Sequence, residues 1–291
     1  MASRVALITV LAGAVGCLTA AAQTQTKQAP MSALALKDRV YWVKGGAGAN
    51  TGFIVGSKEV LVIDAKMTEE AAKAMQAEIR KVTPLPVGRI LLTHSDGDHV
   101  NGLAGFPHGL PILAHANTKK DMEEAFKDPK LASLLPYLPN RTSNGDLAGI
   151  LDGVRVNALY FGPAHTSGDW VVHLPDHKIA FVGDLVFVGR DPLIHRKKGG
   201  NSFGLVKVLQ KIVALDADTF VSGHSDPLTK ADIKNLIASI EEKQAKVKGL
   251  IQQGKPLDEI KAAFGAVSAP GQPAPRFPSL IDIIYQELTE K

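Results

Sequence analysis

The sequence predicts an α+β fold built as a four-layer αββα sandwich with a C-terminal helical extension. Two halves of the chain are rich in short apolar strands, and helices accompany the strands of each half, so that they would cover the outer faces of two facing sheets. The composition agrees, because 45% hydrophobic and 21% charged residues are ordinary for a globular protein with a buried core. A length of 291 residues suits one large domain or two small ones.

The N-terminus has the pattern of an export signal. A short basic start, Met1–Arg4, precedes the apolar run Val5–Thr19, and small residues then fit a cleavage site near Ala22. Because this run is short for a membrane span, we expect residues 1–22 to be a cleaved signal peptide, and the mature chain to be secreted or periplasmic with no transmembrane span. The alternative is a lipoprotein anchored at Cys17, the only cysteine, although the usual leucine three residues before it is absent.

The rest of the chain divides into three segments. Residues 23–36 are polar and rich in Pro and Ala, which predicts a flexible leader. Strand and helix patterns over 37–228 predict the main domain. Residues 229–291 are mostly helical in pattern, with a break at Gly254 to Pro256 and a Pro/Gly linker over 269–278. This C-terminal helical segment either packs on the main domain or forms an oligomer interface, since periodicity fits both.

The first β-rich half contains a strand over 40–43 and a hairpin made of 52–55 and 60–63. Thr68 is a favourable N-cap followed by two glutamates, which predicts a helix to about Lys81. The half continues with a strand ending at Thr93, a strand over 111–114, a charged helix over 117–127 and an irregular segment over 128–150.

The second β-rich half begins with an alternating segment over 154–159. Two apolar strands follow, and a short polar turn joins them. A Gly-rich and basic loop precedes the next helix. These elements are the strands over 170–174 and 179–182, the loop over 189–202, the helix over 203–215 and the strand over 219–222.

Four potential metal ligands lie within six residues, directly after the predicted strand that ends at Thr93. They are His94, Asp96, Asp98 and His99. Side chains at i, i+2 and i+4 of an extended segment point the same way, so the first three can converge. Gly97 gives the backbone the freedom to turn, which brings His99 to the same side. Imidazole and carboxylate together form a ligand set for zinc, iron or manganese. The alternative is a solvated polar loop.

Three later segments each place one potential ligand after a β run. His165 lies in a tight loop between two strands, Asp184 follows the strand over 179–182, and His224 follows the strand over 219–222. Each residue alone also fits an ordinary turn. Together they form a series, because ligands held at strand ends meet at one edge of a fold, where rigid backbone fixes their geometry.

With these residues the chain resembles the metallo-β-lactamase-fold hydrolase superfamily, whose pattern is His-x-His-x-Asp-His followed by His, Asp and His. The resemblance covers about residues 38 to 228, with all motifs in order. It implies an αββα sandwich with a binuclear metal site between the sheets. It assigns His94, Asp96 and His165 to one metal, Asp98, His99 and His224 to the other, and Asp184 to a bridge between them, as in the glyoxalase II-like branch.

Asp64 follows the strand over 60–63 and matches an acid that braces the site in the same superfamily. Its alternative role is a plain cap at the strand end.

Asp96 departs from the superfamily pattern, which has histidine there. The extra carboxylate makes the metal cluster more neutral, so that it acidifies a bound water less. A carboxylate also favours harder metals. Two divalent zinc ions remain the expected cofactors, with iron or manganese as alternatives. The flavodiiron oxygen reductases, on the same fold, have a glutamate at this position, although their flavin domain has no counterpart in this chain.

The resemblance implies a metal-dependent hydrolase that cleaves an ester, lactone, thioester or β-lactam bond. A hydroxide that bridges the metals, oriented by Asp98, would attack the electrophilic centre of a small-molecule substrate. Two alternatives of other classes remain: a di-iron redox protein and a non-catalytic metal-binding domain.

The distribution of charge indicates which kinds of binding partner the protein has. The net charge of +4 is spread along the chain with no Lys/Arg cluster among aromatic residues, which argues against nucleic acid. The loop over 189–201 follows Asp184 and carries several cations, which favours an anionic substrate; the alternative is a solvated surface loop.

Overall fold

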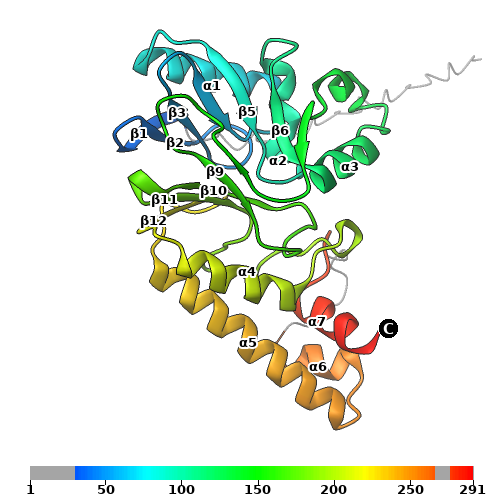
Figure 1. Cartoon of the computed structure of the whole chain (residues 1–291). Coiled ribbons are helices and arrows are strands. Elements are labelled where there is room, and N and C mark those ends of the chain that lie inside the picture. Colours follow the sequence, from blue (N-terminus) through cyan, green and yellow to red (C-terminus); the bar gives the residue numbers. More distant parts are fainter. Residues whose placement is uncertain (1–29, 266–275, 291) are drawn as a thin grey trace, which may run out of the picture.

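The computed structural model describes residues 30–265 and 276–290, and it has the four-layer αββα architecture that the sequence predicts. Two sheets face each other, and helices cover the outer face of each sheet (Figure 1). The predicted signal peptide over 1–22, with Cys17, lies outside the described residues. Within the described part of the chain, no helix is both long and apolar enough to cross a membrane.

The first sheet has seven strands that follow one another in chain order. They are β1 (Ser32–Lys37), β2 (Val40–Lys44), β3 (Thr51–Val55), β4 (Val60–Ile63), β5 (Val87–Leu91), β6 (Ile112–His115) and β7 (Arg141–Ser143). The pairs from β1 to β4 are antiparallel, and those from β4 to β7 are parallel. All four residues of β4 are buried, which explains its unbroken apolar sequence.

The second sheet has five strands in the order β12-β11-β10-β9-β8. They are β8 (Leu147–Ala148), β9 (Asn157–Tyr160), β10 (Trp170–Leu174), β11 (Ile179–Gly183) and β12 (Thr219–Ser222). Only the β11–β12 pair is parallel, so the chain leaves β11 and the outermost strand β12 at the same end of the sheet. β10 and β11 are buried throughout because they lie between the other sheet and the outer helices.

Helices cover the outer face of each sheet (Figure 1). α1 begins after Thr68, whose hydroxyl accepts a hydrogen bond from the Ala71 amide, as the sequence predicts. The first sheet carries α1 (Glu69–Val82), α2 (Gly97–Val100), α3 (Ala116–Ala125) and the short 3-10 helices η1 (Asn101–Gly105) and η2 (Ala132–Tyr137). After the second sheet come α4 (Ser202–Ala214), α5 (Lys230–Gln252), α6 (Leu257–Ala263) and α7 (Leu280–Thr289). Two 3-10 turns, η3 (Pro175–His177) and η4 (Arg196–Lys198), lie in the second half.

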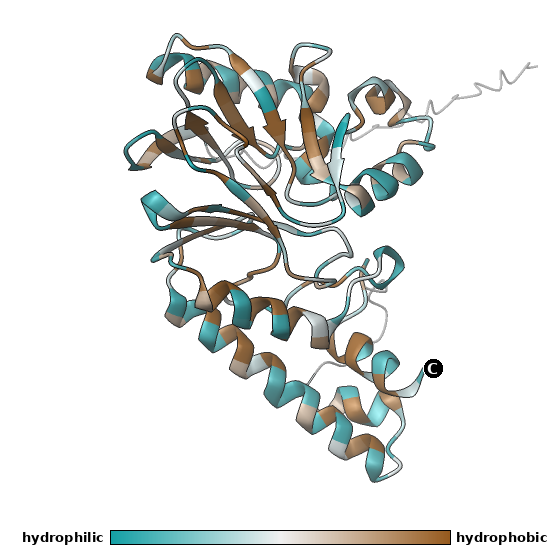
Figure 2. Cartoon of the chain, in the orientation of Figure 1, coloured by the Kyte–Doolittle hydropathy of each residue, from teal (hydrophilic) through white to brown (hydrophobic). Residues whose placement is uncertain are grey.

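Three apolar clusters stabilise the layers. One lies between the sheets and contains Trp170, Phe181 and Leu61. A second packs α1, through Met75 and Ile79, onto the first sheet. The third joins the second sheet to the C-terminal helices. The hydropathy colouring shows the strands and the inward helix faces as the apolar parts of the molecule (Figure 2).

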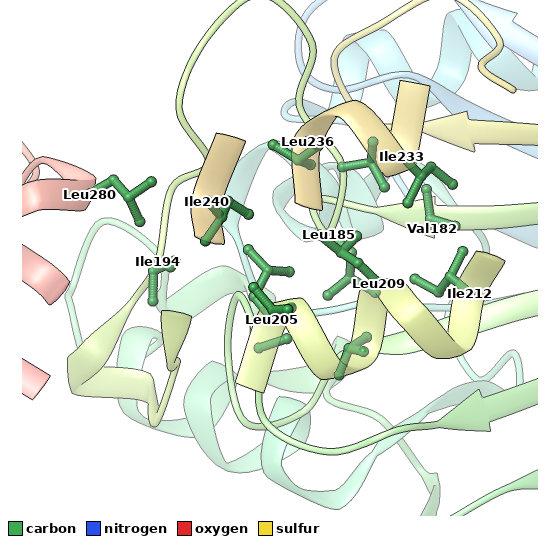
Figure 3. Close-up of a cluster of buried hydrophobic side chains, with 14 of the residues drawn as sticks. Val182, Leu185, Ile194, Leu205, Leu209, Ile212, Ile233, Leu236, Ile240 and Leu280 are labelled. Carbon is green, nitrogen blue, oxygen red and sulfur yellow. The ribbon is translucent and has the colours of Figure 1, made fainter. Parts of the chain in front are cut away.

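The C-terminal helices pack on the domain. Figure 3 shows Leu205, Leu209 and Ile212 of α4 against Ile233 and Ile240 of α5. Residues of α7 belong to the same cluster, so this part of the chain completes a layer of the domain. Of the two arrangements that the sequence left open, packing on the domain is therefore present.

Two sequence predictions were wrong in detail. The flexible leader over 23–36 is contradicted for residues 32–36, which belong to β1 and pair with β2; residues 23–29 lie outside the described residues. The segment 128–150, expected to be irregular, contains η2, β7 and β8. Both errors have one cause: these short edge strands gain their pairing from the sheet, and their own sequences carry little periodic signal.

We predict that Ile240→Ala lowers the free energy of unfolding by about 2–4 kcal/mol, because it leaves a cavity between α5 and α4. Ile240 is fully buried in the third cluster. Chemical denaturation measures the change, with Lys234→Ala, at an exposed position of the same helix, as the control. Equal effects of the two substitutions would contradict the packing of α5 described above.

Candidate metal centre

The predicted ligand residues all lie at one edge of the sandwich. His94 follows β5 by two residues, Asp184 directly follows β11, and His224 follows β12. His165 lies in the loop from β9 to β10, and that loop is tied to the first sheet because the Trp170 amide donates to the Thr93 carbonyl at 2.8 Å. The ends of strands from both sheets therefore supply one site.

The structure brings all seven predicted residues together. They form two neighbouring groups, and within each group one ligand atom per residue lies within 4.8 Å of the others. The first group contains His94, Asp96, His165 and Asp184; the second contains Asp98, His99 and His224. That these residues bind metal remains a prediction from the sequence.

Asp184 lies between the two groups. Its Oδ1 is 3.0 Å from His99 Nε2, and its Oδ2 is 3.1 Å from His224 Nε2 and 4.0 Å from His94 Nε2. Gly223 permits this approach, because a Cβ atom there would lie 2.3 Å from Asp184 Oδ1 and 2.8 Å from the His99 ring. The position of Asp184 fits the bridging role that the superfamily resemblance implies.

The residues present fit divalent cations. His94 is buried, and its Nε2 has no hydrogen-bond partner among the described residues. Its other ring nitrogen lies 3.0 Å from Thr93 Oγ1, so Nε2 alone faces the cluster. A buried ring nitrogen without a partner is costly unless a ligand completes it. Four imidazoles and three carboxylates make up the two neighbouring groups, which is a donor set suited to zinc, iron or manganese.

Contacts behind the site orient two of the imidazoles. Asp64 Oδ2 lies 2.8 Å from His99 Nδ1, and the Leu193 carbonyl lies 2.8 Å from His165 Nδ1. Each oxygen can accept a hydrogen bond from the Nδ1–H group, which keeps that proton on Nδ1 and leaves Nε2 to face the cluster. Asp64 is itself fixed by hydrogen bonds from the Thr93 amide and hydroxyl, both 2.8 Å. The structure thus places Asp64 where a bracing acid is expected.

Asp96 has two partners that the sequence did not single out. His195 Nε2 lies 2.8 Å from its Oδ2, and Lys198 Nζ lies 2.7 Å from its Oδ1. His165 Nε2 also approaches Oδ2, at 3.2 Å. His195 and Lys198 belong to the loop over 189–201, which the sequence predicted to face an anionic substrate. The signal available in the sequence was a histidine among the cations of that loop.

Opposite charges control the protonation of the site. Burial alone would lower the pKa of His165, but the hydrogen bond and charge of Asp96 raise it to about 9. Hydrogen bonds to Asp184 and Asp98 raise the pKa of His224 to about 9. Burial would also lower the pKa of His99, but the charges of Asp184 and Asp64 hold that pKa well above its ordinary value. Without cations these imidazoles therefore hold protons against the carboxylates.

His94 behaves in the opposite way. Burial, followed by the neighbouring imidazoles of His99 and His165, holds the pKa of His94 well below its ordinary value. This ring stays neutral, which is the form that binds a metal.

The loop before β3 connects the segment that contains Asp98 to the segment that contains Gly223 and His224, a role that the sequence did not predict. The Ala49 amide donates to the Asp98 carbonyl at 3.2 Å, and the Asn50 amide donates to the Gly223 carbonyl at 2.7 Å. Lys66 is fully buried and donates to the carbonyls of Gly45 and Ala49, both at 2.8 Å. Burial lowers the pKa of Lys66 to about 8. This lysine fixes the loop that holds the ligands in register.

The fold and the site define the class of protein. The chain belongs to the metallo-beta-lactamase superfamily, whose sequence profile matches residues 45–224. Superfamily membership supports a metal-dependent hydrolase in general.

Similar proteins vary in activity. The chain is 25% identical over 202 residues to the 2,4-dinitroanisole O-demethylase subunit alpha of Nocardioides sp. (strain JS1661), covering 68% of this chain and 59% of that protein. It is 32% identical over 180 residues to a hydroxyacylglutathione hydrolase of Cereibacter sphaeroides (strain ATCC 17025 / ATH 2.4.3), covering 60% of this chain and 62% of the relative. The chain thus spans about three fifths of the length of these curated relatives.

Solved structures show the same fold. The inverting sec-alkylsulfatase Pisa1 from Pseudomonas sp. superposes with a TM-score of 0.70 at 16% identity, over 89% of this chain and 50% of that chain. A metallo beta lactamase from Erythrobacter litoralis superposes with a TM-score of 0.59 at 22% identity, over 73% of this chain and 97% of that chain.

We predict that Asp64→Asn weakens zinc binding about 10- to 100-fold, because the neutral amide oxygen can accept the His99 Nδ1 hydrogen bond but lacks the negative charge that makes the imidazole a stronger donor to the metal. Competition with a chromophoric chelator measures the affinity. Asp176→Asn, which removes an exposed carboxylate paired with Arg155, serves as the control. Wild-type affinity in Asp64→Asn would show that Asp64 is only a cap at the strand end.

Zinc binding should release protons. His165 and His224 have pKa values of about 9 in the cation-free protein, against an ordinary value of 6.5, so both hold protons at neutral pH. Their charged pairs stabilise the cation-free fold fully below pH 6.5, and this contribution is lost as the pH rises through about 9. Apparent zinc affinity should therefore increase with pH over this interval. The pKa of His99 is also held well above its ordinary value, so calorimetric titration at pH 7 in buffers of different ionisation enthalpy should show release of about three protons. A heat independent of the buffer would contradict the protonated pairs.

Proposed function

We propose that this protein is an exported, binuclear metal-dependent hydrolase of small molecules that cleaves an ester, lactone, thioester or β-lactam bond. One observation carries the proposal: seven imidazole and carboxylate side chains from both sheets converge in two adjacent groups, with Asp184 between them. Zinc is the proposed metal in both groups. The curated relatives include a hydroxyacylglutathione hydrolase, which supports hydrolysis as a class and leaves the bond open.

When bound, a pair of dications supplies a nucleophilic hydroxide near neutral pH and polarises the bond under attack. His94, Asp96 and His165 would hold one cation, and Asp98, His99 and His224 the other. Asp184 would contact both. The role of the protein is to keep these donors fixed, and the hydrogen bonds behind His99 and His165 serve that purpose.

Asp98 is the carboxylate best placed to orient the attacking water. The side chain of Asp98 is 27% exposed, whereas that of Asp184 is 3% exposed, so Asp98 lies on the open side of the cluster. Its Oδ2 is 3.3 Å from His224 Nε2, which fixes one oxygen at the second group. The carboxylate can hold a water by hydrogen bond and accept its proton during attack.

Apolar side chains flank the site and favour a substrate with an apolar part. The Phe187 ring stacks on the ligand His224 at 5.6 Å, and the Phe277 ring meets His195 edge-on at 5.4 Å. Phe277 and Val188 are both exposed, as large apolar side chains at a binding surface often are. Arg190 lies over the Phe187 ring at 4.3 Å, which places a cation beside this surface and supports an anionic group on the substrate.

A di-iron redox protein is the second candidate, and Asp96 is the observation that favours it, because a carboxylate prefers the harder metal. Lys198 weakens the case, since it offsets the charge of that carboxylate at 2.7 Å. Visible absorbance and an EPR signal after anaerobic purification would identify iron, whereas a zinc protein is colourless. Stoichiometric metal without turnover would favour the third alternative, a metal-binding domain.

Export rests on the sequence of residues 1–22. N-terminal sequencing of the mature protein from a bacterial periplasm tests it. A start near Gln23 is expected, and an uncut N-terminus in the cytoplasm would contradict export.

Asp98→Asn should lower kcat about 100-fold or more for whichever bond is cleaved, since the amide cannot accept the proton of the attacking water. The experiment screens zinc-loaded protein on a panel of esters, lactones, thioesters and nitrocefin, before and after removal of metal by a chelator. Asp226→Asn, which removes the exposed partner of Lys44, is the matched control. A zinc-loaded protein that cleaves none of these bonds, or one equally active without metal, would overturn the proposed hydrolase.

A further inference from the structure

We infer that Lys198 is the counter-charge of Asp96: the Asp96–Lys198 pair occupies the place of one neutral ligand and sets the charge of the first metal group. This inference rests on the binuclear site of the proposed function. It assigns to Lys198 of the loop over 189–201 a role at the metal cluster, whereas Arg190 of the same loop lies beside the proposed substrate surface.

The Lys198 ammonium group forms an ion pair with the Asp96 carboxylate. Its Nζ lies 2.7 Å from Asp96 Oδ1, 3.0 Å from Ser95 Oγ and 3.5 Å from the Ser95 carbonyl. Its side chain is 25% exposed and that of Asp96 is 12% exposed, so water screens the pair less than an ordinary surface ion pair. A second carboxylate, that of Asp121, also lies near Lys198. The Ser95 hydroxyl donates a hydrogen bond to Asp121 Oδ2 at 3.4 Å.

The backbone fixes Lys198 relative to the ligand His165. The Ser167 amide donates to the Lys198 carbonyl at 2.8 Å, and the His195 amide donates to the His165 carbonyl at 2.8 Å. Gly200 lies so close to this loop that a Cβ atom there would be 2.3 Å from the His165 carbonyl oxygen. The turn η4 that carries Lys198 is therefore attached to the segment that supplies a ligand of the same group.

The two contacts divide the Asp96 carboxylate. Oδ1 faces the ammonium group, while Oδ2 faces His165 and His195 on the side of the other ligands. A cation that binds between Oδ2 and His165 Nε2 would replace their contact, while Oδ2 keeps its contact with His195 and Oδ1 its contact with the ammonium group. An aspartate with a paired lysine contributes no net charge, as a neutral imidazole would. The carboxylate at this position consequently does not make the cluster more neutral than a histidine would.

A charge-swap series tests the inference. In Asp96→His, Lys198 faces two dications without its carboxylate, and zinc affinity of the first group should fall. The double variant D96H/K198M removes the unpaired cation and should bind zinc about tenfold or more tightly than D96H/K197M. Lys197 is the matched control because it is an exposed lysine next to Lys198 in the same turn. Zinc bound per protein is measured over a series of buffered free zinc concentrations, after circular dichroism has shown that each variant is folded.

The single variants keep the test decisive if a double variant does not fold. Lys198→Met should retain zinc affinity at or above that of Lys197→Met, because Asp96 then carries its full charge. Equal affinities of D96H/K198M and D96H/K197M, or a loss of affinity in Lys198→Met alone, would overturn the charge compensation. Wild-type protein that binds no zinc would instead overturn the proposed function.

Discussion

The meeting of strand ends from two sheets at one edge is the constraint on which the rest of this structure depends. β5 delivers His94, and the parallel pair β11 and β12 delivers Asp184 and His224. The inter-sheet core keeps these ends at a fixed separation, since Trp170 and Phe181 are almost fully buried between the sheets. A hydrogen bond from Trp170 to Thr93 then closes the sandwich beside the ligands. Residues far apart in sequence can thus form one rigid donor set.

Charge pairing governs the site at every position except His94, which stays neutral. Each carboxylate that faces the cluster contacts a histidine or a lysine, and three of the imidazoles have raised pKa values for that reason. Without cations, protonated imidazoles therefore form ion pairs with the carboxylates of the cluster. Bound cations would replace those protons as the positive charges that face the carboxylates. Asp96 fits this scheme only when Lys198 is counted with it. The departure from the superfamily pattern is accompanied by a compensating cation from a distant loop.

The sequence was sufficient to predict the sandwich and the seven clustered residues, because most of the predicted ligands follow strongly apolar strands and strand ends are easily located. His94, Asp184 and His224 all belong to this kind of signal. The partners of Asp96 could not be predicted in the same way. His195 and Lys198 lie in a loop without periodicity, and only backbone hydrogen bonds to the His165 loop direct them to the cluster. Strand β1 was not predicted, because its pairing with β2 stabilises it and its largely exposed sequence carries little periodic signal.

Anomalous scattering from a zinc-loaded crystal at the zinc absorption edge tests the binuclear site most directly. We expect two peaks on either side of the Asp184 carboxylate, one beside His94, Asp96 and His165 and the other beside Asp98, His99 and His224. A single peak outside both groups, or no peak in a crystal of folded protein at saturating zinc, would contradict the binuclear site.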